Sequence, residues 1–343
     1  MSAFSSRAFF PDQLLRELME LRVTNPEFAW KAAQVRVQRK SLALNGKLNI
    51  VAADHPARNV TKVGDDPLAM ADRREYLARI LRVLSSDRVD GVMATMDILE
   101  DLLTIDGLLR KAGEQTFLDN RVLIASLNRG GLAGSAWELD DPMTGATAAI
   151  SKDWRLDGVK VLLRVDEIEP ASLKTMLACA QAINESNALQ LPMFLEPLPV
   201  RRTDKGWTVV KTAEALARLA GVASALGDSS RYLWLKLPYC DGFETVARST
   251  TLPILLLGGE SAGDPAPFLR QLESAMAAGT NVRGAMVGRN VVFPGDDDPL
   301  AIAEAAGGII HNGWSVEQAT KSLPAMRGKN LDRLQKASAG GPA

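Results

Sequence analysis

Short apolar segments alternate with longer amphipathic segments along most of this chain. Eight segments have the length and composition of β-strands, at residues 48–54, 90–96, 121–128, 157–165, 191–198, 231–238, 252–259 and 284–291. Most of them are almost continuously apolar instead of alternating between apolar and polar residues. We therefore expect strands that are buried on both faces, as the strands of parallel sheets are.

The segments between these strands have helical periodicity. Residues 72–86 place Tyr76, Leu77, Ile80, Leu81 and Leu84 on one stripe, and residues 171–186 and 212–226 have the same kind of pattern. Eight strands joined by helices predict an α/β protein with a single (β/α)8 TIM barrel, and an open doubly wound sheet is the alternative. The predicted barrel domain covers residues 46–325.

Two further segments flank the predicted barrel domain. Residues 1–45 form an N-terminal helical extension that could be an interface or a plug of the barrel, and residues 326–343 form a C-terminal tail. Residues 1–15, MSAFSSRAFFPDQLL, lack the features of a signal peptide, and no apolar run approaches the roughly 18 residues of a transmembrane helix. We expect a cytoplasmic protein.

Charge and cysteine content exclude several classes of function. The 343 residues include 40 basic and 41 acidic side chains, so no net field would attract nucleic acid or an anionic membrane surface. The two cysteines, Cys179 and Cys240, each lie in an apolar context, which predicts buried thiols in a reducing compartment. An anionic ligand would have to be bound by local charges.

In a TIM barrel the functional site lies at the C-terminal ends of the strands. Polar residues at these positions are therefore the candidates for function. They are Asp54, His55 and Arg58 after the first strand, Asn128 and Arg129 after the third, Lys160 and Arg164 in the fourth, Glu196 in the fifth, Lys236 in the sixth, Gly258, Gly259, Glu260 and Ser261 after the seventh, and Gly288, Arg289 and Asn290 after the eighth.

Two lysines and a glutamate within apolar strands predict a buried cluster of charges. An unpaired buried charge costs several kcal/mol, so Lys160, Glu196 and Lys236 should be paired in the lumen. Burial and a neighbouring cation both lower the pKa of a lysine, as nucleophilic lysines require. Lys236 with Lys160 beside it fits this chemistry, and an ion pair without catalytic function is the alternative.

The glycines after the last two strands predict a phosphate site. Gly258–Gly259 and Gly288–Arg289 follow strands seven and eight, where TIM barrels commonly bind phosphate with backbone N–H groups and a short helix. Arg289 would add a charge-assisted contact. The same glycines could serve only the turns.

Several of these segments together resemble one family of enzymes. VKVLLRVDE (159–167), PMFLEPL (192–198), LWLKLPY (233–239), LLLGGES (255–261) and GAMVGRNV (284–291) are similar to strands of the class I aldolases that include tagatose-bisphosphate, sulfofructose-phosphate, archaeal-type fructose-bisphosphate and deoxyribose-phosphate aldolases. AADHP (52–56) resembles their first-strand turn, and SLNRG (126–130) resembles their third-strand loop. The resemblance covers residues 48–318.

The resemblance implies a role for each of the candidate residues. Lys236 would form the Schiff base, Asp54 and Glu196 would assist proton transfers, and Lys160 would lie beside the iminium. His55 and Asn128 lie in segments that resemble the family's substrate-binding turn and loop, and Gly258, Gly259, Ser261, Gly288 and Arg289 would bind the substrate phosphate. Arg164 departs from the family, since many members have an aromatic acid–base residue there. Arg164, with Arg58 or Arg129, suggests a second anionic group on the substrate.

The resemblance also implies a reaction. It is the cleavage of a phosphorylated keto-sugar or keto-sugar acid to dihydroxyacetone phosphate and an aldehyde, by a lyase that is expected to be a homo-oligomer and to need no cofactor. The inositol-catabolism subgroup is the preferred one, with 6-phospho-5-dehydro-2-deoxy-D-gluconate cleaved to malonate semialdehyde. Fructose, tagatose, sulfofructose and deoxyribose phosphates remain alternatives, as do a Schiff-base dehydratase or transaldolase and a barrel that binds sugar phosphates without catalysis. No metal is expected, because the only two histidines, His55 and His311, are far apart in sequence.

Overall fold

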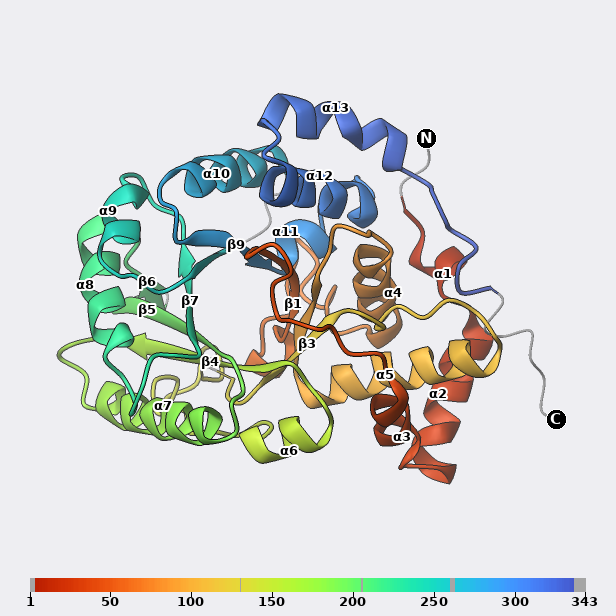
Figure 1. The fold of residues 1–343 in the computed structure, drawn as a ribbon, viewed down its shortest axis with the longest axis horizontal. Helices are drawn as coiled ribbons and strands as arrows, with labels where there is room; N and C mark the ends of the chain where they lie inside the picture. The colour runs from red at the N-terminus through yellow and green to blue at the C-terminus, as the bar shows by residue number, and fades with distance from the viewer. Residues whose placement is uncertain (1–3, 130, 205, 260–262, 336–343) are drawn as a thin grey trace.

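The protein folds into a closed barrel of eight parallel strands with helices around it (Figure 1). The computed structural model describes residues 4–129, 131–204, 206–259 and 263–335. The barrel strands are β1 (Leu48–Ala53), β2 (Gly91–Ala94), β3 (Val122–Ser126), β4 (Gly158–Val165), β5 (Met193–Thr203), β7 (Leu233–Pro238), β8 (Ile254–Leu257) and β9 (Val282–Val287). The sequence predicted all eight of them.

The pairing of the strands closes the barrel. The order is β4-β3-β2-β1-β9-β8-β7-β5, and β4 also pairs with β5, with Lys160 opposite Phe194 and Leu162 opposite Glu196. Every one of these pairs is parallel. The single (β/α)8 TIM barrel is therefore confirmed, and the open sheet is wrong.

Helices follow the strands as the apolar periodicity predicts. Three predicted helices correspond to α4 (Arg73–Leu84), α7 (Ala171–Ala188) and α8 (Ala213–Ser224). The others around the barrel are η1 (Pro56–Arg58), α5 (Met96–Lys111), α6 (Ala148–Asp153), α9 (Phe243–Arg248), α10 (Ala266–Ala277), α11 (Arg289–Val292), α12 (Pro299–Asn312) and α13 (Val316–Met326).

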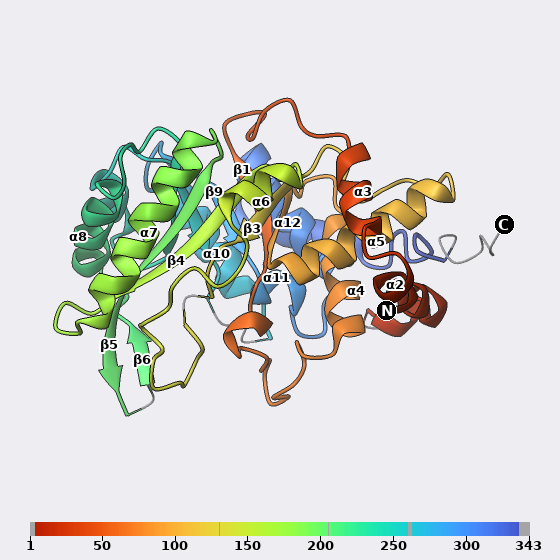
Figure 2. The ribbon, with the colours of Figure 1, turned by 90° about the horizontal axis from the view of Figure 1, so that it is seen from below.

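Two elements differ from the sequence prediction. The last barrel strand ends at Val287, because residues 289–292 form the short helix α11 instead of continuing the strand. The fifth strand runs on to Thr203 and pairs with an additional antiparallel strand, β6 (Gly206–Val209). The β5–β6 hairpin projects from the same end of the barrel as the connections that follow β1 and β3 (Figure 2).

The alternation of side chains along the strands produces two cores. One fills the lumen with residues such as Ile50, Met93, Phe194, Leu255 and Met286. The other lies between the outer face of the barrel and the helices. Because both faces of each strand are covered by apolar side chains, the strands appear in the sequence as continuous apolar runs.

The N-terminal segment lies on the outside of the barrel. Its helices are α1 (Ser6–Phe9), α2 (Asp12–Thr24) and α3 (Phe28–Val35); α1 packs against α4, and α2 and α3 pack against α5. The residues after α3 take a different course, since Leu42 and Ala43 pack against the lumen core near the start of β1. The helices thus do not plug the barrel, but this short segment closes its N-terminal end.

Candidate active site

A cavity of about 670 Å³ opens at the C-terminal ends of the barrel strands. Its lining comes from strands and connections far apart in the sequence, from His55 near β1 to Arg289 after β9. Glu196 and Lys236 reach into it from β5 and β7. This is the end of the barrel at which TIM-barrel enzymes have their active sites.

The alternation along the strands directs three charged side chains into the lumen. On β5, Glu196 lies on the same side as Phe194, which belongs to the lumen core. On β7, Lys236 lies on the same side as Trp234, which packs against that core. Lys160 is directed to the lumen from β4 by the same rule, since Val159 and Val161 belong to the outer core. Glu196, Lys236 and Lys160 thus lie in the lumen next to its apolar core.

Four buried charges form a continuous chain in this lumen. Nζ of Lys160 lies 2.8 Å from Oδ2 of Asp54 and 2.9 Å from Oε2 of Glu196. Nζ of Lys236 lies 2.9 Å from the same glutamate oxygen. All four residues are at most 6% exposed. Two ammonium groups and two carboxylates are therefore paired away from water, as their burial requires.

The two lysines respond to this cluster in opposite ways. Burial lowers the pKa of Lys236, and the ammonium of Lys160 adds to this effect, so that together they outweigh Glu196 and Asp54. Burial also acts to lower the pKa of Lys160, but Asp54 and Glu196 outweigh it and the pKa is raised. Lys160 therefore holds its proton firmly, whereas Lys236 is the lysine that loses its proton more easily.

Both carboxyl groups are kept ionised. Burial acts to raise the pKa of Glu196, but the two lysines outweigh it and lower the pKa to about 2. The pKa of Asp54 is lowered for the same reasons, with Lys160 as the largest favourable charge. Each carboxylate can therefore accept a proton during a reaction at neutral pH.

His55 lies beside this cluster as a neutral ring. Burial is the largest cause that lowers its pKa, and the cations Arg289, Lys236 and Arg58 act in the same direction against the pull of Asp54, so that the pKa falls to about 3. The Nδ1 atom of His55 lies 4.0 Å from Oδ1 of Asp54, which is beyond hydrogen-bond distance. His55 can thus offer a neutral donor or acceptor to a molecule in the cavity.

The glycines at the ends of β8 and β9 line the cavity together with Arg289. Each allows a close approach: a Cβ on Gly288 would lie 2.3 Å from Cε1 of His55, and one on Gly258 would lie 2.5 Å from Cγ1 of Val287. Gly259 has a φ of +73°, in the left-handed region that favours glycine. The structure thus brings Gly258, Gly259, Gly288 and Arg289 together, whereas Ser261 lies outside the described residues.

Two predicted binding residues have partners within the protein. Arg164 is paired with the buried carboxylate of Glu138, and its Nη2 donates to the backbone oxygen of Glu138 at 2.8 Å. The anion expected beside Arg164 is therefore already supplied by the chain itself. The amide of Asn128 donates to the oxygen of Leu162 and accepts from its nitrogen, both at 2.8 Å. Asn128 thus ties the end of β3 to β4, and its contact with substrate stays a prediction.

Several residues of the cavity were not among those predicted from the sequence. Glu138 comes from the connection between β3 and α6, and Trp207, Thr208, Val209 and Lys211 come from the β5–β6 hairpin and the residues that follow it. Neither segment has a barrel-strand pattern, so its return to the strand ends could not be predicted. Arg58, which the sequence did predict, also lines the cavity, and its Nε is buried without a hydrogen-bond partner among the described residues.

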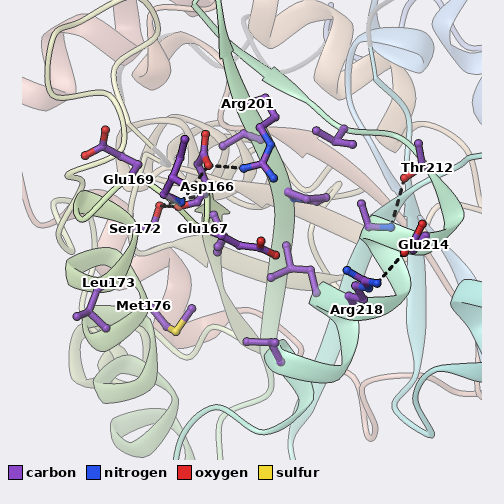
Figure 3. A pocket seen from close by; sticks show the side chains of 18 of the residues that line it. Asp166, Glu167, Glu169, Ser172, Leu173, Met176, Arg201, Thr212, Glu214 and Arg218 are labelled. Atoms are coloured by element: carbon purple, nitrogen blue, oxygen red, sulfur yellow. Dashed lines mark hydrogen bonds and ion pairs between the residues drawn. The ribbon is translucent and has the colours of Figure 1, made fainter.

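A second cavity, of about 640 Å³, lies outside the barrel between α7 and α8 (Figure 3). Its charged side chains neutralise one another: Arg201 pairs with Asp166, and Arg218 pairs with Glu214 at 2.7 Å. None of the described residues that line it is a lysine. The lumen cavity is therefore the better candidate for chemistry.

Among the described residues, none of the helices is long and apolar enough to cross a membrane. In the same part of the chain, no group of three or more histidine, cysteine, aspartate or glutamate side chains is arranged to hold a metal ion.

Comparison with known proteins places this site in a family. The structure is similar to the crystal structure of Cgl0159 from Corynebacterium glutamicum (Brevibacterium flavum), with a TM-score of 0.82 and 35% sequence identity over 89% of this chain and 99% of that chain. An archaeal fructose-1,6-bisphosphate aldolase, with its catalytic lysine covalently bound to the carbinolamine intermediate of the substrate, shares the fold at a TM-score of 0.54 and 22% identity, over 82% of this chain and 99% of that one.

One curated relative matches over a shorter segment. A stretch of 107 residues is 34% identical to 2-amino-3,7-dideoxy-D-threo-hept-6-ulosonate synthase 1 of Archaeoglobus fulgidus, and it covers 31% of this chain and 38% of the synthase. The model of the Cgl0159-like family matches residues 46–307, which include all eight barrel strands and the whole charge cluster. On that match, this chain belongs to the Cgl0159-like family.

Proposed function

We propose that this protein is a class I aldolase that forms a Schiff base between Lys236 and the ketone of a phosphorylated substrate. One observation carries this proposal. The surroundings in the lumen lower the pKa of Lys236 but raise the pKa of Lys160. An amine attacks a carbonyl only in its neutral form, so a buried lysine beside a fixed cation is the arrangement that this chemistry needs.

Two of the similar proteins support a reaction of this kind. The archaeal aldolase with the same fold has a catalytic lysine bound covalently to its substrate. According to its name, the Archaeoglobus fulgidus relative is a synthase of 2-amino-3,7-dideoxy-D-threo-hept-6-ulosonate. The archaeal aldolase is only 22% identical in sequence, and the synthase matches over part of its length. Both therefore support the proposal without assigning a substrate.

The lumen groups would act in sequence. Neutral Lys236 adds to the ketone carbon, and loss of water gives an iminium. A carboxylate, Asp54 or Glu196, takes the proton from the substrate hydroxyl while the carbon–carbon bond breaks and its electron pair moves to the iminium nitrogen. The aldehyde leaves, and the enamine is protonated on carbon and hydrolysed to release the ketone product. Lys160 keeps its positive charge throughout and holds both carboxylates in place.

The phosphate of the substrate would bind at the ends of β8 and β9. Gly258, Gly259 and Gly288 leave backbone exposed to the cavity, and Arg289 lines it beside them. Backbone N–H groups and a guanidinium together suit a dianionic phosphate. Dihydroxyacetone phosphate would then be the ketone product.

We further propose, as the preferred substrate, 6-phospho-5-dehydro-2-deoxy-D-gluconate, which has a carboxylate at the end opposite its phosphate. Glu138 already neutralises Arg164, so Arg58 is the better partner for this carboxylate. The aldehyde product would be malonate semialdehyde. Fructose and tagatose bisphosphates, with a second phosphate in place of the carboxylate, are the substrates to compare with it.

Reductive trapping tests the proposal. The protein is incubated with dihydroxyacetone phosphate and borohydride, digested with trypsin, and examined by mass spectrometry. We expect a covalent adduct on the peptide that contains Lys236, and none in a Lys236→Met variant that keeps its thermal stability. Wild-type protein that binds the phosphate compound but forms no adduct would be a binding barrel and not an aldolase.

Trapping alone does not separate an aldolase from a Schiff-base dehydratase or transaldolase. Product analysis by mass spectrometry makes this distinction, with a small panel of phosphorylated ketoses and keto-sugar acids as substrates. An aldolase releases a free aldehyde and dihydroxyacetone phosphate in equal amounts. Release of water from an intact carbon chain would identify a dehydratase instead.

A further inference from the structure

The β5–β6 hairpin forms one wall of the lumen cavity. β5 runs past the rim of the barrel, and its residues Val200 to Thr203 pair with Val209 to Gly206 of β6 (Figure 2). The hairpin is held by a separate apolar cluster at the rim, in which Leu139, Leu162, Leu198 and Val200 are buried and Trp207 and Val209 pack against them. The position of the wall is therefore fixed by packing.

This wall directs a lysine toward the proposed phosphate site. Lys211 follows Val210, the first residue after β6, and lines the same cavity as Gly258, Gly259 and Arg289. Its Nζ lies 3.9 Å from the position that a Cβ on Gly259 would occupy. Because Gly259 has no side chain, nothing from that residue stands between the ammonium group and the cavity.

No charge within the described part of the chain accounts for this placement of Lys211. The ion pairs found among the described residues do not include it. Asp264, an acidic side chain that also lines the cavity, uses its Oδ1 to accept from the N–H of Ala266 at 2.9 Å. The exposed ammonium of Lys211 therefore lies at the glycine turn without a carboxylate partner among the described residues, where it can pair with a bound anion.

We propose that Lys211 is a ligand of the substrate phosphate, supplied by the β5–β6 hairpin to the site formed by Gly258, Gly259, Gly288 and Arg289. Its ammonium contributes a point charge from the wall of the cavity, whereas Arg289 approaches from the end of β9. The identity of the anion as a substrate phosphate rests on the proposed function. Binding of the anion itself does not require Lys236.

The test uses inorganic phosphate and two related ketones as probes. The dissociation constant of phosphate is measured by titration calorimetry on the full chain. The concentration that gives half-maximal borohydride trapping is measured for dihydroxyacetone phosphate and for dihydroxyacetone, which lacks the phosphate. The variants are Lys211→Met, Lys211→Arg and, as a matched control, Lys31→Met, which changes an exposed lysine on α3 away from the cavity.

Lys211→Met is expected to weaken phosphate binding by about tenfold, the size of one charge-assisted contact. The half-maximal concentration of dihydroxyacetone phosphate should rise by the same factor, with no change in the maximal rate of trapping or in the trapping of dihydroxyacetone. Lys211→Arg should restore most of the binding, and Lys31→Met should have no effect.

Phosphate that binds equally to the wild type and to Lys211→Met, or that does not bind to the wild type, would overturn the proposal. Failure of the aldolase proposal has a different signature. In that case no adduct forms on Lys236, and the loss of phosphate binding in Lys211→Met is still seen.

Discussion

Replacing Lys160 by methionine would remove a positive charge beside Lys236 and should reduce the neutral fraction of that lysine. Both ammonium groups lie 2.9 Å from one oxygen of Glu196, which fixes how close they are. They are therefore no more than about 6 Å apart, where two like charges repel by about 3 kcal/mol at an effective dielectric constant of about 20. That energy corresponds to about a hundredfold change in the neutral fraction of Lys236 below its pKa.

Schiff-base formation as a function of pH measures this effect. The lowered pKa of Lys236 means that its neutral fraction, and with it the rate of trapping, rises with pH until that pKa is passed and then levels off. In Lys160→Met the pKa should move back up, because Lys160 no longer repels the proton and Glu196 attracts it more strongly. We expect trapping with dihydroxyacetone phosphate and cyanoborohydride to be about 100-fold slower at pH 7, with the two rates converging at high pH.

A charge-preserving variant separates electrostatics from packing. Lys160→Arg keeps the cation between Asp54 and Glu196 and should keep the wild-type pH profile, provided that thermal unfolding shows an intact fold. A Lys160→Met variant that is slowed by the same factor at every pH would refute the electrostatic role. Lys160 would then only hold the lumen together.

Two further predictions concern stability. Gly288→Ala should destabilise the protein by about 1–3 kcal/mol, since its Cβ would lie 2.6 Å from the backbone oxygen of Ala52. Gly221→Ala should instead stabilise the protein by about 0.5–1 kcal/mol, because a Cβ at this position in α8 meets none of the described atoms within 4 Å. Urea unfolding measures both, and equal effects would refute the packing argument. Burial raises the pKa of Asp106 to about 6, so its stabilising contribution is complete below pH 3.8 and is lost as the pH rises through 6. The Asp106→Asn variant can still accept from the N–H of Phe117 but has no buried charge at high pH. It should therefore be more stable than the wild type by on the order of 2 kcal/mol at pH 8 but not at pH 3.5. A difference in stability that does not vary with pH would contradict this.

The barrel could be predicted from the sequence because its strands are buried on both faces. Each strand is therefore a continuous apolar run, and a charged residue within it is conspicuous. The same alternation identified Lys160, Glu196 and Lys236 as lumen residues, since side chains two apart on a strand share a face. The position of the site followed from the end of the strands at which the polar residues stand.

The parts that could not be predicted depend on contacts between distant segments. Nothing in the fourth strand indicates that Arg164 is neutralised by Glu138, because Glu138 reaches it from an irregular connection. The strand β6 has only four residues and no apolar run. The cavity wall that contains Trp207 and Lys211 therefore could not be predicted from hydrophobic periodicity.

The sequence by itself determined the barrel, the end at which its candidate site lies and the residue types available there. Only the tertiary structure decided which lysine loses its proton more easily. Lys160 lies within 2.9 Å of both Asp54 and Glu196, whereas Glu196 is the only carboxylate of the described residues at that distance from Lys236. The pKa of a buried group depends on the charges within a few ångströms of it, and those distances are fixed by how the strands close into the barrel.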